Sequence, residues 1–232
     1  KSHEPAYTEK VLRLPDCYQP NDNRRPISSS PQSRADHHLP EDAFVLCSFN
    51  NNYKITPTVF DIWMRILKQF PQTVLWLLKD TPTAESNLRR EAQARGVHPE
   101  RLIFAQRMKS EDHLARHVCA DLFMDTYPCN AHTTASDALW AGLPLVTCSG
   151  HSFASRVAGS LLTTMQLPEL ISDNLIAYEQ KIVDLINNPK HLSDIKSRLE
   201  KNKLTSPLFD TKKHTQAWEK LLLDVYQHST RE

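Results

Sequence analysis

The sequence predicts an α/β protein built on a Rossmann-like, doubly wound parallel sheet. Short apolar runs alternate along the chain with longer segments of helical periodicity. The apolar runs are continuous rather than alternating, which is typical of strands buried on both faces of a sheet. Each run ends in polar or turn-forming residues before the next helical segment begins. A repeated strand–helix order of this kind folds into a parallel sheet with helices on both faces.

The first 42 residues differ from the rest of the chain. Residues 9–14 predict a strand, but the stretch from Pro15 to Pro40 is rich in Pro, Ser, Asn and Arg and has no periodicity. We interpret this stretch as an extended linker or a loop that packs on something outside the chain. The α/β pattern starts at Ala43 and continues to the C-terminal end.

The elements follow from local signals. Apolar runs predict five strands and a short edge strand, at residues 44–49, 73–78, 101–105, 122–124, 145–147 and 169–171. Thr56 and Pro57 suit the cap and first turn of a helix, whereas Gly96 and Gly142 suit helix C-terminal ends. Helices are expected from Thr56 to before Pro71, then at residues 84–95, 110–120, 134–141, 152–165, 174–187, 190–202 and 211–227.

The central stretch of the sequence, residues 129–144, predicts a polar turn followed by a helix. His132, Thr133 and Thr134 stand at the helix N-terminus, where unpaired N–H groups and the helix dipole suit an anion such as a phosphate. Asp137 lies one turn further along, within reach of a ribose hydroxyl if the phosphates of a nucleotide sit on the helix end. The alternative is that Thr133 or Thr134 is only a helix cap.

Polar turns at residues 51–54, 108–113 and 129–134 all follow strands, so they are expected to gather in one crevice at the carboxyl edge of the sheet. There Lys54 could neutralise a diphosphate leaving group, or be a solvated surface cation. His113 and Arg116 share a helix face and could contact a base, or form an exposed polar face. Arg156 interrupts an apolar helix and is expected to form a structural ion pair.

Composition excludes several classes of protein. With 232 residues, 40% hydrophobic content and a net charge of +1, the chain is neither a strongly basic nucleic-acid binder nor suited to an anionic membrane surface. No apolar run could span a bilayer and no signal peptide is evident, so a cytoplasmic location is expected; the absence of an initial Met suggests a fragment.

The five Cys and eleven His show neither disulfide nor metal-ligand spacing. Cys47, Cys119 and Cys148 are expected as core thiols, and His37 and His38 as solvated.

Several stretches together resemble the C-terminal half of the protein O-GlcNAc transferase family. They are residues 49–55, 74–78, 129–142, 154–158 and 206–209, within a resemblance that covers roughly residues 7–226. The resemblance implies the GT-B architecture of inverting glycosyltransferases, with two facing Rossmann-like lobes and tetratricopeptide repeats ahead of them. It identifies residues 43–232 as the C-terminal lobe, which binds the nucleotide sugar, and residues 1–42 as a linker and the tail of the preceding lobe.

The resemblance also assigns roles to individual residues. Lys54 corresponds to the phosphate-contacting lysine, which we expect to act in catalysis by stabilising the departing UDP. The other correspondences are His113 and Arg116 with the base, His132, Thr133 and Thr134 with the pyrophosphate, Asp137 with the ribose, Cys129 with the acetamido group and the backbone near Met108 with uracil. Two positions depart from the animal enzymes: Asn51 replaces a Gln and Ser110 replaces a Lys that approaches uridine. The short segment 21–42 lacks the large insert of the animal enzymes, which favours a bacterial-type member.

The resemblance predicts a parent enzyme that transfers GlcNAc from UDP-GlcNAc to Ser or Thr of a protein acceptor, without metal or cofactor and without a nucleic-acid or membrane partner. The repeats and the catalytic His of the other lobe lie outside this chain, which is therefore expected to bind UDP weakly and to be inactive alone. Residues 221–223 on the last helix are expected to cover the other lobe. Alternatives are a GDP-fucose donor, as in SPINDLY-type enzymes, a UDP-glucose donor, a non-catalytic nucleotide-binding module, or a GT-B-shaped nucleotide-sugar epimerase.

Overall fold

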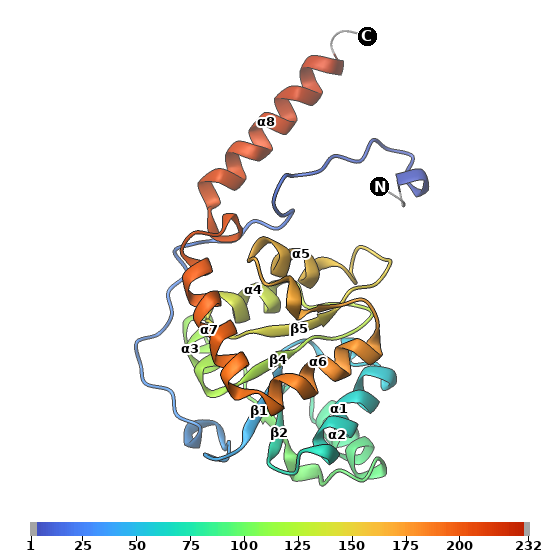
Figure 1. Ribbon diagram of the computed structural model, residues 1–232, viewed down its shortest axis with the longest axis vertical. Coiled ribbons are helices and arrows are strands. Elements are labelled where there is room, and N and C mark those ends of the chain that lie inside the picture. The colour runs from blue at the N-terminus through green and yellow to red at the C-terminus, as the bar shows by residue number, and fades with distance from the viewer. Residues whose placement is uncertain (1–3, 230–232) are drawn as a thin grey trace.

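The protein forms a six-stranded parallel sheet in the order β3-β2-β1-β4-β5-β6 (Figure 1). The computed structural model describes residues 4–229. The strands are β1 (Phe44–Ser48), β2 (Thr73–Leu78), β3 (Leu102–Ala105), β4 (Leu122–Met124), β5 (Leu145–Cys148) and β6 (Ile171–Ser172). The predicted Rossmann-like, doubly wound fold is therefore confirmed.

The strand order reverses between β1 and β4, which lie side by side at the centre of the sheet. Leu46 of β1 is level with Leu75 of β2 on one side and with Leu122 of β4 on the other. These side chains are completely buried, which explains why the strands appear in the sequence as continuous apolar runs. The loops that leave the carboxyl ends of β1 and β4 diverge to opposite faces, and a crevice at this edge follows from that topology.

Helices cover both faces of the sheet (Figure 1). One face carries α1 (Pro57–Gln69), α2 (Pro82–Ala94) and α6 (Leu175–Asn187), and the other carries α3 (Ser110–Ala115), α4 (Thr133–Trp140) and α5 (Val157–Thr164). α7 (Pro189–Lys203) contacts both α4 and α6, and α8 (Thr211–Ser229) follows it. Short 3-10 turns lie at Glu4–Ala6, Ala35–His37, Asn52–Lys54, Pro99–Arg101, Arg116–Cys119, Pro168–Leu170 and Pro207–Phe209.

The predicted helix signals are present at several ends. The Thr56 hydroxyl accepts a hydrogen bond from the Val59 amide, with Pro57 in the first turn of α1. Asn174 caps α6 in the same way, through the Ala177 amide at 2.8 Å. Gly142 follows α4 with a φ of 82°, a conformation that side chains with a Cβ rarely adopt.

Several predicted elements are wrong or shorter than expected. Residues 9–14 form no strand, because they lie outside the sheet and have no neighbouring strand with which to pair. The helix expected at residues 152–165 begins only at Val157, since Ser152 and Ser155 bond each other and close a turn before it. The helix expected at residues 110–120 is α3 followed by a 3-10 turn. His37 is half-buried rather than solvated, with its ring 5.0 Å from that of Trp76.

The segment of residues 15–42, which we call the strap, packs on this same lobe (blue in Figure 1). Cys17 and Leu39 are buried in the core of the lobe. The strap donates hydrogen bonds from Gln19 to Ser136 at 2.7 Å and from Asn21 to the Leu208 carbonyl at 3.2 Å, and Arg34 pairs with Asp121. The expectation that this segment packs on something outside the chain is therefore wrong, although a lobe boundary at residue 42 stays a prediction.

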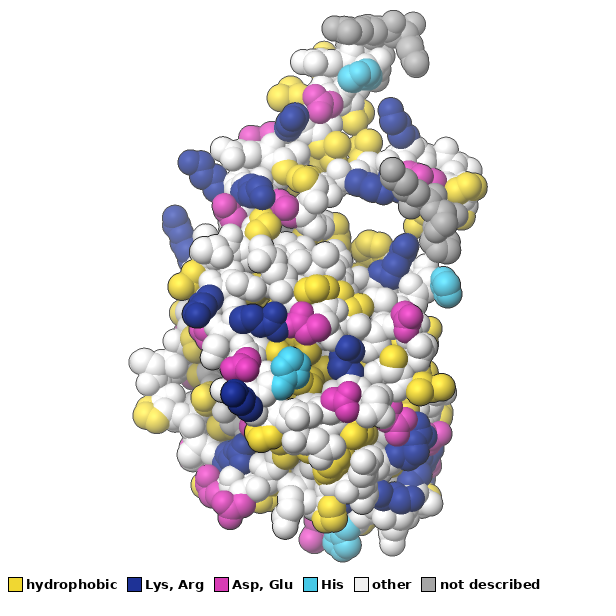
Figure 2. All heavy atoms as spheres, in the orientation of Figure 1, with side chains coloured by type: hydrophobic (Ala, Val, Ile, Leu, Met, Phe, Trp, Pro, Cys, Tyr) yellow, Lys and Arg dark blue, Asp and Glu magenta, His cyan; other side chains and the backbone are white. Residues whose placement is uncertain are grey.

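α8 projects away from the body of the molecule (Figure 1). Figure 2 shows hydrophobic side chains gathered over this helix, and basic and acidic side chains interspersed over the face in view. Trp218, Leu222, Leu223 and Val225 of α8 are all more than a third exposed. That this helix covers another lobe stays a prediction. Within residues 4–229, no helix combines the length and the apolar character that crossing a membrane requires.

Candidate functional site

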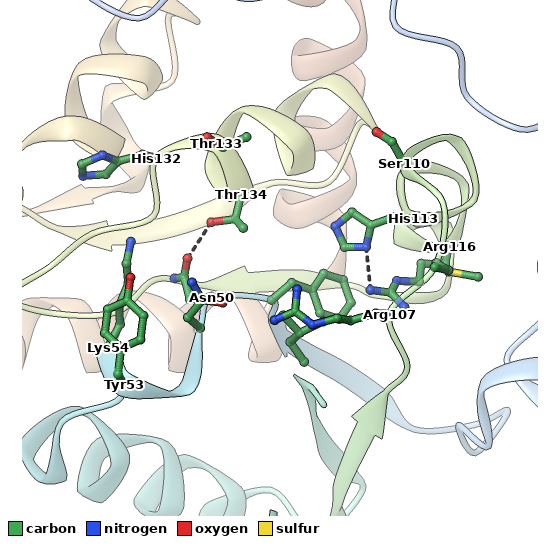
Figure 3. A pocket seen from close by; sticks show the side chains of 14 residues that line it. Asn50, Tyr53, Lys54, Arg107, Ser110, His113, Arg116, His132, Thr133 and Thr134 are labelled. Atoms are coloured by element: carbon green, nitrogen blue, oxygen red, sulfur yellow. Dashed lines mark hydrogen bonds between the residues drawn. The ribbon is translucent and has the colours of Figure 1, made fainter. Parts of the chain in front are cut away.

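A cleft of about 530 Å³ opens at the carboxyl edge of the sheet, next to β1 and β4. Its volume is in the range of small-ligand sites. Eight of the ten predicted site residues line it: Asn51, Lys54, Met108, His113, Arg116, His132, Thr133 and Thr134. They come from the loops after β1 and β3, from α3 and the turn after it, and from the start of α4 (Figure 3). The structure therefore gathers residues up to 83 positions apart in the sequence at one place.

Lys54 ends the 3-10 turn that follows β1 and is half-buried in the wall of the cleft. Its Nζ donates a hydrogen bond to the Asn130 carbonyl at 2.8 Å. The ammonium group is thus held against the loop that leads into α4, rather than extended into solvent. Burial, and then the charge of Lys54, lower the pKa of His132. The interpretation of Lys54 as a solvated surface cation is wrong.

The start of α4 carries no side-chain cap. His132 occupies the cap position, and neither its side chain nor those of Thr133 and Thr134 accept the first helical N–H groups. The Thr134 hydroxyl instead donates a hydrogen bond to Asn50 Oδ1 at 2.5 Å (Figure 3). The alternative that Thr133 or Thr134 serves only as a cap is therefore wrong. An uncapped helix N-terminus that opens on a cleft suits a phosphate.

Asp125, which was not predicted as a site residue from the sequence, fixes the loop between β4 and α4 through its buried carboxyl group. Its Oδ1 accepts hydrogen bonds from the amides of Thr126 at 2.7 Å and Ala131 at 2.6 Å, and its Oδ2 accepts one from the Thr147 hydroxyl at 2.6 Å. Asn50 connects this carboxyl group to Thr134, because its Nδ2 lies 3.4 Å from Asp125 Oδ1. Complete burial raises the pKa of Asp125 to about 7. The only signal in the sequence was an Asp placed directly after a buried strand.

The opposite end of the cleft is built around Arg116, which is 1% exposed. Its Nη1 donates to the Gln106 carbonyl at 2.6 Å, its Nη2 lies 2.5 Å from His113 Nδ1, and its guanidinium carbon lies 4.7 Å from the centre of the Phe49 ring. Arg116 is therefore not part of an exposed polar face, as one alternative held. Because the Gln106 carbonyl and the Phe49 ring hold the Arg116 side chain, its contact with His113 Nδ1 fixes the orientation of that ring.

His113 is neutral in this environment. Burial, followed by the charges of His117 and Arg116, lowers the pKa of His113 to about 3. Arg116 carries only donors, so the bond between them requires His113 Nδ1 to accept, which leaves the ring proton on Nε2. His113 therefore offers the cleft a ring face and an N–H donor, both of which suit a nucleobase.

Two predicted site residues do not line the cleft. Cys129 is half-buried in the loop after β4, and Asp137 is buried and paired with Arg25 of the strap. Arg156 is exposed, and within the part of the chain that the structure describes it pairs with no acidic side chain; its Nε lies 3.3 Å from the Ser152 carbonyl. The ion pair expected for Arg156 is therefore wrong.

Other side chains in the cleft were not predicted as site residues from the sequence. Asn50 links the two central loops, and Arg107 pairs with Asp80 at 3.4 Å and extends along the cleft (Figure 3). The remaining lining residues are Phe49, Tyr53, Leu78 and Ser110. Across residues 4–229, no three His, Cys, Asp or Glu side chains are grouped as a metal site would require, and Cys47, Cys119 and Cys148 are buried free thiols as predicted.

The fold and the cleft define a class of protein. A doubly wound parallel sheet, an uncapped helix N-terminus at its switch point and a facing lysine are the features of a nucleotide-binding lobe. The glycosyl transferase family 41 pattern matches residues 21–218, and the chain belongs to this family.

The chain is similar in sequence to a group of named transferases. It is 40% identical over 211 residues to the probable UDP-N-acetylglucosamine–peptide N-acetylglucosaminyltransferase SEC of Arabidopsis thaliana, covering 88% of this chain and 22% of that protein. It is 39% identical over 195 residues to the corresponding transferase of Caenorhabditis elegans, covering 84% of this chain and 17% of that protein. A SPINDLY protein of Petunia hybrida is 30% identical over 93% of this chain and 23% of its own length. The chain thus spans about a fifth of the length of these relatives.

Solved structures share the fold. A mutant O-GlcNAc transferase of Thermobaculum terrenum matches with a TM-score of 0.79 and 27% identity, over 99% of this chain and 44% of that one. This likeness supports the prediction that the chain is a GT-B lobe. A UDP-GlcNAc 2-epimerase of Neisseria meningitidis matches with a TM-score of 0.53 over 81% of this chain and 47% of that one, but at 9% identity this likeness shows the fold alone.

Proposed function

We propose that this chain is the donor-binding lobe of a family 41 glycosyltransferase that transfers GlcNAc from UDP-GlcNAc to Ser or Thr of a protein acceptor. The observation that carries the proposal is the meeting of Lys54 and the uncapped start of α4 in one cleft with His113. The relatives that are 39% and 40% identical are named for this transfer. The cleft supplies features that such a donor needs at its diphosphate and at its base.

The diphosphate would lie between Lys54 and the N-terminus of α4. In an inverting transfer the acceptor oxygen attacks the anomeric carbon, and the bond from that carbon to the β-phosphate oxygen breaks. The electron pair of this bond stays on the diphosphate, so negative charge grows there in the transition state. A fixed ammonium and helix N–H groups stabilise such charge without reorganising. Groups that take the proton of the acceptor hydroxyl would belong to the preceding lobe.

The base would lie at the other end of the cleft. A neutral His113 with its proton on Nε2 offers one donor, and the backbone near Met108 and the side chain of Asn51 offer further polar partners. A uracil presents both acceptor oxygens and an N–H donor, so this set of groups suits it. Cys129 would contact the acetamido group of the donor, and Asp137 would contact its ribose.

Isothermal titration calorimetry of this chain with UDP, and with GDP as a comparison, tests the proposal. Lys54→Ala should weaken UDP binding by about tenfold or more, which is the usual loss when a charge-assisted contact to a phosphate is removed. Lys68→Ala, which removes an exposed lysine at the far end of α1, is the matched control and should bind like the wild type.

The outcomes separate the alternatives. A preference for GDP would favour a fucosyl donor, as in SPINDLY-type enzymes, and a screen of UDP-sugars would distinguish UDP-glucose from UDP-GlcNAc. Conversion of free UDP-GlcNAc without any acceptor would favour an epimerase. UDP binding that Lys54→Ala leaves unchanged would contradict the proposed phosphate site, and a biological role that survives this change would favour a non-catalytic module.

A further inference from the structure

Arg25 of the strap lies beside the cleft and contacts both of the helices that line it. Its Nη1 forms an ion pair with Asp137 Oδ1 on α4, and its Nη2 lies 3.3 Å from the Ser110 hydroxyl at the start of α3. Its backbone carbonyl accepts a hydrogen bond from Trp140 Nε1 on α4 at 3.1 Å. One arginine therefore joins the helix proposed to bind phosphate to the helix that carries His113.

Arg25 favours the charged form of the buried Asp137 carboxyl group. Its side chain is 9% exposed, and among residues 4–229 Arg25 is the one group that bonds its carboxylate. Burial raises the pKa of Asp137 above its ordinary value, and the hydrogen bond and charge of Arg25 oppose this rise without cancelling it. Without the guanidinium, a carboxyl group at this depth would favour the protonated form. A carboxylate accepts hydrogen bonds from ribose hydroxyls at both oxygens, whereas a protonated acid has one fewer acceptor site.

α3 also needs an external support. It has only six residues, and no side chain caps its N-terminus. Besides Arg25, the strap contributes the Ser28 amide, which donates to the Glu111 carbonyl at 3.1 Å. These two contacts hold the start of α3, where Ser110 lines the cleft, against the strap and α4. Loss of Arg25 would release one of these two contacts at the start of α3.

We propose that Arg25 is a positioning residue of the nucleotide site, which holds the buried Asp137 carboxylate, the proposed ribose contact, in place on α4 and fixes α3 against α4. This inference rests on the proposed function and adds to it a residue from outside the Rossmann-like sheet. It also gives the strap a role in donor binding beyond that of a linker. Ser110, which lines the cleft, is thereby placed next to a cation from another segment.

UDP titration of Arg25→Gln and Arg25→Lys tests the inference at constant ionic strength. Arg25→Gln should weaken binding about tenfold, the usual effect of losing one hydrogen-bonded charge pair. Arg25→Lys keeps the charge but not both contacts, and should lose about threefold. Arg24→Gln is the matched control, because Arg24 is an exposed neighbour whose side chain makes no hydrogen bond or ion pair within the described part of the chain, and it should bind within about twofold of the wild type.

Two further measurements separate positioning from a general loss of charge or of folding. In an Asp137→Asn background, Arg25→Gln should cost less than about threefold, because the partner it serves is gone. The UDP affinity of Arg25→Gln should also fall more steeply below pH 7 than that of the wild type, since Asp137 then protonates more readily. Inorganic pyrophosphate, which lacks a ribose, should bind Arg25→Gln and Arg24→Gln equally.

The result that overturns the inference is equal or tighter UDP binding by folded Arg25→Gln, which would make Arg25 a neutral contact or an obstruction. If Arg25→Gln does not fold, Arg25→Lys decides, and wild-type affinity in that variant overturns the inference. A wild-type chain that binds no nucleotide would defeat the proposed function and this inference together. Wild-type UDP binding that tolerates Arg25→Gln would defeat this inference alone.

Discussion

Replacing Asp125 with asparagine should stabilise the protein, and by clearly more at pH 8 than at pH 5. Asp125 is completely buried beneath the loop that joins β4 to α4, and its pKa in the fold is about 7. In an unfolded chain the pKa of an aspartate is about 3.9. Between these two values the folded protein binds a proton that the unfolded chain has lost, so the free energy of unfolding decreases as the pH rises.

The magnitude follows from the two pKa values. A difference of about three pH units corresponds to about 4 kcal/mol of stability lost between pH 4 and pH 8 from this one group. Asparagine has the shape of the protonated acid and no charge. Its carbonyl oxygen can still accept from the Thr126 and Ala131 amides, and its Nδ2 can donate to the Thr147 hydroxyl. Asp125→Asn should therefore lack this loss and exceed the wild type by up to about 4 kcal/mol at pH 8.

Urea denaturation at pH 5 and pH 8, followed by circular dichroism, measures the difference. Asp194→Asn, which changes an exposed aspartate on α7, is the control and should move the midpoint little at either pH. The reasoning is refuted if Asp125→Asn is less stable than the wild type by more than about 2 kcal/mol at pH 8. That result would mean that the surrounding N–H groups hold the carboxylate in its charged form.

Two further predictions concern stability. The Tyr178 hydroxyl donates to the backbone carbonyl of Asp125 at 2.9 Å and accepts from Trp63 Nε1 at 3.1 Å. Tyr178→Phe leaves these buried polar groups without a partner, so it should lower the free energy of unfolding by about 1–3 kcal/mol in urea denaturation. An unchanged urea midpoint would contradict this. His113→Gln should flatten the dependence of stability on pH below 6.5. The pKa of His113 in the fold is about 3, so as the pH falls the unfolded chain binds a proton at His113 before the folded chain does. The stability of the wild type therefore decreases as the pH drops, and the variant should lack this decrease. Parallel profiles for His113→Gln and the wild type between pH 7 and pH 5 would show that His113 is protonated normally.

The site residues that could be predicted from the sequence are those in the loops and helix starts that follow the carboxyl ends of the strands. Lys54, Thr134 and His113 each follow a recognisable apolar run within about ten residues, and parallel strands bring their carboxyl ends to one edge. No local pattern marks Asp125 or Asn50 as partners of each other, because their bond joins residues 75 positions apart. The same holds for Arg116, whose side chain looks like part of an exposed helix face until Phe49 and Gln106 are seen around it.

The sequence by itself determined the strands, most of the helices and the polar loops, because apolar periodicity and caps act within a few residues along the chain. The tertiary structure decided which strands are neighbours, and so placed β1 beside β4 with the cleft at their ends. It also decided what the strap does: Arg25 and Asp137 are 112 positions apart, and only the folded chain brings their charges together. Pairings over such distances depend on the packing of the whole sheet and its helices, and no short stretch of sequence contains that information.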